Sequence, residues 1–89
     1  MEQFTKREVG LRVRYLIAAH APHEVKIRIS HLHRHARLKE DLKLSDESME
    51  NLLFHLSKVY NKPLSLFIVQ GCKTLGDLIE KIYEWLKRN

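Results

Sequence analysis

The chain has 89 residues, 44% hydrophobic and 30% charged, which is the composition of one small folded domain spanning residues 1–89. The single Cys72 excludes an internal disulfide framework and a cysteine-rich zinc site. No apolar run approaches the ~20 residues that a membrane helix needs, and residues 1–10 lack the apolar segment of a signal peptide. We therefore expect a cytoplasmic protein that does not associate with membranes.

The formal charge of +5 is unevenly distributed along the chain. Residues 1–39 contain nine Lys and Arg residues against three Glu residues, whereas residues 40–89 contain seven basic and eight acidic residues. Such asymmetry is found in proteins that bind anions, and also where basic side chains only face solvent.

An amphipathic helix is expected between Thr5 and Pro22. Thr5 and Glu8 have the spacing of a capping box, and Pro22 ends the pattern. The inward stripe recurs at helical spacing and consists of Val9, Val13, Leu16, Ile17 and His20.

Residues 21–44 form a long connection. Within it Val25, Ile27 and Ile29 alternate with basic residues, as in a short strand. Because nothing else in the chain alternates as cleanly, a strand would lack a partner, and we expect an extended segment laid across the helices. Residues 31–35 (HLHRH) place two histidines at a spacing that suits a metal, but no carboxylate or thiol completes a site and nearby arginines oppose a cation. We expect no metal site.

Two further amphipathic helices are expected at residues 45–60 and 74–87. Ser45 or Asp46 can cap the first, residues 61–63 (NKP) stop it, and Thr74 with Asp77 forms a capping box for the second. Their inward faces are Met49, Leu52, Leu53, Leu56, Val59 and Tyr60 in the first, and Leu75, Leu78, Ile79, Ile82, Tyr83 and Leu86 in the second. The apolar run 64–70 (LSLFIVQ) between them fits either a short buried helix or an extended segment.

The aromatic side chains have the pattern of core or half-buried residues of a small bundle, and they are Tyr15, Phe54, Tyr60, Phe67, Tyr83 and Trp85. No nucleophile or acid–base pair can be placed beside His20 or His55, and Cys72 fits a buried, space-filling thiol. We therefore expect no enzymatic activity.

Three motifs are spaced along residues 36–83. Residues 36–42 read ARLKEDL, Tyr60 is followed four residues later by Leu64, and residues 74–78 read TLGDL. These motifs, and the order of helix, long loop, helix, short apolar segment and helix, resemble the acyl carrier protein family, which has A-x-F-x-E-D-L, F-x-x-x-I and T-V-x-D-L at the same mutual spacing. The resemblance implies an all-α fold, a small four-helix bundle with a long loop between the first and second helices.

Function in the resembled family depends on a serine of a D-S-L motif at the start of the second helix, which carries the phosphopantetheine arm. In the ungapped register this chain has residues 45–47 (SDE) there, so Asp46 stands in the place of the serine and cannot be modified. The resemblance therefore implies a carrier fold with no cofactor, acting as a non-catalytic docking or regulatory protein. Asp46 suits a helix N-terminus, and this explanation is preferred to a carboxylate that imitates the phosphate of a modified carrier.

An alternative register inserts two residues, so that Ser48 and Met49 match the S-L pair. The protein would then be a working acyl or peptidyl carrier, with phosphopantetheine on Ser48. Against this register, Tyr60 and the block at residues 74–78 would each slip by two positions unless a deletion followed.

Partner binding is implied by the acidic second helix, which in this family docks onto basic patches of enzymes of fatty-acid or polyketide type. The acidic residues retained here are Glu40, Asp41, Asp46, Glu47 and Glu50. The net positive charge of the whole chain departs from the family, which puts its usual synthase enzymes in doubt. We expect a monomer that meets a protein partner.

A third hypothesis comes from the basic segment, residues 26–39, which is suited to contact phosphates. Its candidate anion-binding residues are Arg28, Arg34, Arg37 and Lys39. No recognition-helix pattern or base-stacking aromatic motif accompanies them, so we do not expect nucleic acid as the main partner.

Overall fold

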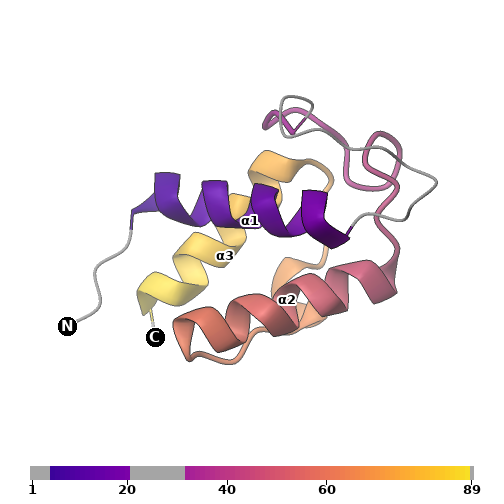
Figure 1. The fold of residues 1–89 in the computed structure, drawn as a ribbon. Coiled ribbons are helices and arrows are strands. Elements are labelled where there is room, and N and C mark those ends of the chain that lie inside the picture. Colours follow the sequence, from indigo (N-terminus) through magenta and orange to yellow (C-terminus); the bar gives the residue numbers. More distant parts are fainter. Residues whose placement is uncertain (1–4, 21–31, 89) are drawn as a thin grey trace.

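The computed structural model describes residues 5–20 and 32–88, and the elements in these ranges are helical (Figure 1). They are α1 (Lys6–His20), α2 (Asp46–Tyr60), the 3-10 helix η2 (Leu66–Val69) and α3 (Leu75–Arg88). Within the described ranges the only β-type pairing is an isolated bridge between Arg37 and Thr74. The all-α prediction is therefore confirmed.

The prediction of a four-helix bundle is not met in full. In the described ranges there are three α-helices, and the apolar run between the last two forms the single 3-10 turn η2. Pro63 precedes this run and Gly71, with a φ of 85°, follows it, so few residues remain between α2 and α3. The alternating segment 25–29 and His31 lie outside the described residues, as do Arg28 and the side chain of His20.

The core forms where the inward stripes of the helices meet. α1 packs on α2 and on α3, and η2 packs on the same two helices (Figure 1). Nearly all the predicted inward residues of the helices are buried or half-buried. The side chains with no exposed surface are Val9, Val13, Leu56, Leu75, Leu78, Ile82 and Leu86. No helix in the described part is long and apolar enough to cross a membrane.

Each α-helix begins at the hydroxyl residue that the sequence indicates. The backbone N–H of Glu8 donates to Thr5 Oγ1 at 3.1 Å, and that of Ser48 donates to Ser45 Oγ at 3.1 Å. Ser45, and not Asp46, is therefore the N-cap of α2. Asn61 ends this helix in the left-handed conformation, with a φ of 55°.

The connection before α2 lies against the start of α3. The backbone N–H groups of Leu75 and Gly76 donate to the carbonyls of Ala36 and Arg34, at 2.9 and 2.8 Å, and Leu38 donates to Lys73 at 2.9 Å. Apolar residues of this connection enter the core, and they are Leu32, Ala36, Leu38, Leu42 and Leu44. A loop that looks unstructured in sequence thus forms part of the packed body.

Several apolar side chains do not lie where the sequence pattern places them. Val59 is exposed, because the buried stripe of α2 passes from Leu56 to Tyr60 and Val59 lies beside it. Tyr15, Phe54 and Phe67 are also exposed, which corrects the prediction that they are core or half-buried residues. Tyr15 and Phe54 lie off the inward stripes of their helices, and in η2 only Val69 is buried.

The carboxylate of Asp77, at the start of α3, makes the stability of the fold depend on pH in the acid range. The backbone N–H of Thr74, and then that of Lys73, donates to Asp77 and lowers the pKa of its carboxyl below 3.8. A carboxyl whose pKa is lower in the folded state stabilises that state above its unfolded pKa, and this contribution disappears as the pH falls through the folded pKa.

We therefore expect Asp77→Asn to be less stable than the parent at neutral pH, by an amount that shrinks below about pH 4. Urea midpoints of both proteins at about pH 7 and about pH 2.5 measure this. If the difference between the urea midpoints of the two proteins is the same at both pH values, the ionised Asp77 carboxylate does not stabilise the start of α3.

Candidate functional site

Three of the five acidic residues predicted to bind a partner lie in the first two turns of α2. Asp46, Glu47 and Glu50 are all exposed. Because Ser45 provides the capping oxygen, Asp46 is the first helical residue and its carboxylate faces solvent near the positive end of the helix dipole. These three carboxylates form one acidic surface, called here the α2 acidic face.

The two other predicted partner-binding acids lie elsewhere. Asp41 accepts the backbone N–H of Arg37 at 2.8 Å, and Glu40 forms an ion pair with the guanidinium of the same Arg37 at 2.5 Å. Asp41 is 3.9 Å from that guanidinium. Glu40 and Asp41 are therefore partly neutralised within their own turn.

Ser48, the candidate modification site of the alternative register, lies in the first turn of α2 and is half-buried. Its backbone N–H and its hydroxyl both meet the hydroxyl of Ser45, each at 3.1 Å. The Ser48 oxygen, the atom that the alternative register would modify, thus accepts a hydrogen bond from the N-cap residue. The serine is thus part of the cap of the helix.

A groove of about 590 Å³ runs beside the α2 acidic face, between α2 and the segment that contains η2. Glu50 and Phe54 line it from α2, and Phe67 lines it from η2. The side chains of Phe54 and Phe67 are 55% and 80% exposed. Lys58 Nζ lies 4.4 Å from the centre of the Phe54 ring and covers part of it.

This apolar groove is not predicted by the periodicity of the sequence. One signal was available, because Phe54 stands next to the inward residue Leu53 but off the stripe that continues to Leu56 and Tyr60. No such signal exists for Phe67, since a continuous apolar run has no period.

The predicted anion-binding residues that the structure describes have different surroundings. Arg28 lies outside the described residues, and Arg37 is engaged by the two acids of its own turn. Lys39 is exposed on the connection, and Arg34 lines a different pocket together with residues of α1 and α3. Anion binding by these four residues therefore stays a prediction.

Other reactive groups are few in the described ranges. No three His, Cys, Asp or Glu side chains of this part gather as metal ligands. Cys72 is half-buried, and burial together with the nearby Asp77 raises the pKa of its thiol. A raised thiol pKa lowers the fraction of reactive thiolate at neutral pH.

No protein-family model matches this chain, and neither a curated protein nor a solved structure is significantly similar to it.

Proposed function

We propose that this chain is a carrier-like helical module without a phosphopantetheine arm, which acts as a non-catalytic docking or regulatory protein. The support is the carrier-like spacing of the motifs at residues 36–42 and 74–78. These two motifs pair through backbone hydrogen bonds between the connection and the start of α3. Asp46 stands at the expected position of the serine, on the exposed first turn of α2.

One observation carries the docking proposal: acidic and aromatic side chains share one exposed stripe. Glu47, Glu50 and Phe54 follow at spacings of three and four residues, which places them along the same side of α2. Phe67 stands across the groove from this stripe. An exposed aromatic pair beside carboxylates suits a protein partner that offers a basic patch and an apolar side chain.

The docking surface is tested by charge reversal and by removal of the rings. We expect Glu47→Lys with Glu50→Lys, and separately Phe54→Ser with Phe67→Ser, to weaken binding of a purified partner by about tenfold or more. Binding is measured by calorimetry, after crosslinking in cell extract has identified the partner.

The matched control for charge reversal is Glu84→Lys, since Glu84 lines another groove, beside Cys72 and Lys81. Near-parental folding of all variants by circular dichroism is required. Equal loss of binding in the control and in the reversed α2 variant would contradict docking through this helix.

The second candidate function is a working carrier modified on Ser48, and the observation that favours it is the position of Ser48 in the first turn of α2. We expect no phosphopantetheine to be added when the protein is incubated with coenzyme A, magnesium and a broad-specificity phosphopantetheinyl transferase. Intact-mass spectrometry beside a carrier that is modified provides the measurement. A mass gain that disappears in Ser48→Ala would establish the carrier function and overturn the armless proposal.

A further inference from the structure

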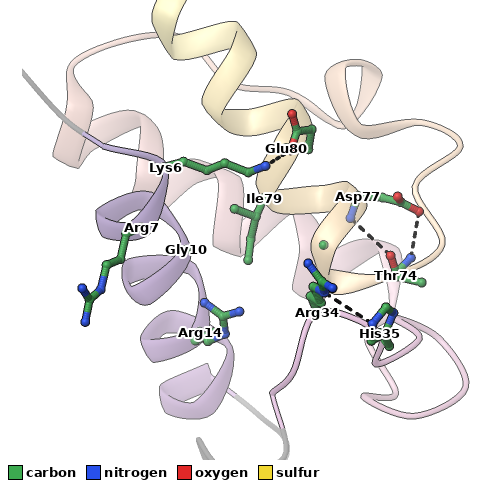
Figure 2. A pocket seen from close by; sticks show the side chains of 11 residues that line it. Lys6, Arg7, Gly10, Arg14, Arg34, His35, Thr74, Asp77, Ile79 and Glu80 are labelled. Atoms are coloured by element: carbon green, nitrogen blue, oxygen red, sulfur yellow. Dashed lines mark hydrogen bonds and ion pairs between the residues drawn. The ribbon is translucent and has the colours of Figure 1, made fainter.

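A pocket of about 600 Å³ lies where the start of α1, the connection before α2 and the start of α3 meet (Figure 2). It is on a different set of elements from the α2 acidic face and its groove. The ionisable groups that line it are Lys6, Arg7, Arg14, Arg34, His35, Asp77 and Glu80. Basic side chains therefore outnumber acidic ones around this pocket.

Both acidic side chains of the pocket already have partners. Glu80 forms an ion pair with Lys6, and Asp77 accepts the backbone N–H groups at the start of α3 (Figure 2). Within the described ranges neither Arg14 nor Arg34 forms an ion pair. The positive charge of these two guanidiniums is thus left without a carboxylate partner there.

Hydrogen bonds to a backbone carbonyl and to an imidazole nitrogen hold the two arginines in place. Arg14 is half-buried, and its Nε donates to the carbonyl of Leu32 at 2.7 Å. Arg34 Nε donates to His35 Nε2 at 3.3 Å. Figure 2 shows Arg14 on α1 and Arg34 on the facing connection, whereas Arg7 extends away from them. Because each Nε is used, the terminal NH2 groups remain as the donors for a ligand.

Two glycines make room for these arginines. A Cβ at Gly10 would lie 2.9 Å from the Arg14 guanidinium nitrogen Nη1, so glycine lets that guanidinium lie against α1. A Cβ at Gly76 would lie 3.0 Å from the carbonyl oxygen of Arg34 and 3.2 Å from its Cβ. The same glycine donates its backbone N–H to that carbonyl. Helix interiors disfavour glycine, so Gly10, inside α1, is occupied at some cost to helix stability, whereas Gly76 lies in the first turn of α3.

We propose that this pocket binds the phosphate group of a small phosphorylated molecule through Arg14 and Arg34. Guanidinium forks match the oxygens of a phosphate, and the two positive charges that line the pocket attract an anion. The volume lies in the range of small-ligand pockets. A nucleic acid fits less well, because Arg37 is neutralised by its own turn and does not extend the basic surface.

The proposal does not depend on the docking function and is tested with inorganic phosphate and phenyl phosphate as probes. We follow nitrogen-15 amide and arginine Nε signals during titration at constant ionic strength. Saturable shifts are expected at Gly10, Arg34 and Gly76. Each of Arg14→Gln and Arg34→Gln should weaken the affinity by about tenfold, and tighter binding of phenyl phosphate would identify a phosphate ester as the ligand.

Two further variants separate a specific site from general charge and from folding. Arg37→Gln removes the same charge from the same connection, and its affinity for phosphate should stay within about twofold of the parent. Gly10→Ala changes no charge but displaces the Arg14 guanidinium, and should weaken binding while the fold is kept. Three results would each overturn the proposal. They are an equal loss of affinity in Arg34→Gln and Arg37→Gln, chemical shifts that do not saturate, and an unchanged affinity in Gly10→Ala. Tighter binding of a single-stranded oligonucleotide than of phenyl phosphate, lost equally in Arg37→Gln, would assign the surface to nucleic acid instead.

Discussion

Replacing Leu78 by alanine is expected to lower the free energy of unfolding by about 2–5 kcal/mol. Leu78 has no exposed surface and lies on the inward stripe of α3, between the buried residues Leu75 and Ile82. The substitution removes apolar contacts and leaves a cavity that the surrounding side chains fill only in part. A small domain has about 5–15 kcal/mol of stability in total, so the variant loses a large share of it.

Leu11→Ala provides the matched control for this prediction. Leu11 lies on α1 and its side chain is 50% exposed, so the same chemical change should cost less than about 1 kcal/mol. Urea unfolding followed by circular dichroism gives both free energies, provided that the slope of the transition is unchanged. Similar losses for Leu78 and Leu11 would mean that the inner stripe of α3 does not face the core.

Gly76→Ala is expected to destabilise the protein by about 1–2 kcal/mol, although alanine favours a helix more than glycine does. The new methyl group meets the carbonyl of Arg34, and that backbone is held by a hydrogen bond of 2.8 Å from Gly76 itself. A backbone atom fixed in this way cannot move aside without loosening the contact between the connection and α3.

Gly10→Ala is the comparison, because its methyl group meets only the flexible end of Arg14 and makes ordinary contacts with Ile79. Here the gain in helix propensity should dominate, and the free energy of unfolding should rise by about 0.5–1 kcal/mol. Thermal and urea unfolding of both variants provide the measurement. A stabilised Gly76→Ala protein would show that the connection does not press on the start of α3.

The helices and their ends were largely predictable from local sequence. Thr5 and Thr74 were recognised as caps, and Ser45 as one of two candidates beside Asp46. An N-cap depends on one side chain and on backbone N–H groups within three residues. The inward stripes followed from the period of the helix. Val59 was misplaced because periodicity gives the direction of a stripe but not its width.

The candidate site was predicted less well, because its parts are distant in sequence. The acids at Glu47 and Glu50 could be located on α2, but the exposed Phe67 beside them could not. Arg34 and Arg37 were grouped because they are neighbours in the chain. Their contacts differ, because Arg37 forms an ion pair with an acid of its own turn, whereas Arg34 lines a pocket with residues of α1 and α3.

By itself, the sequence determined that the described part of this protein is helical, where its helices begin to within a residue, and most of the aliphatic side chains that they bury. These properties depend on contacts within one or two helical turns, which composition and spacing encode directly. Only the tertiary structure decided that Phe54 and Phe67 share a groove and that Arg14 lies opposite Arg34. Surfaces of this kind are formed by side chains from separate elements, so they depend on how the helices pack and not on any local pattern.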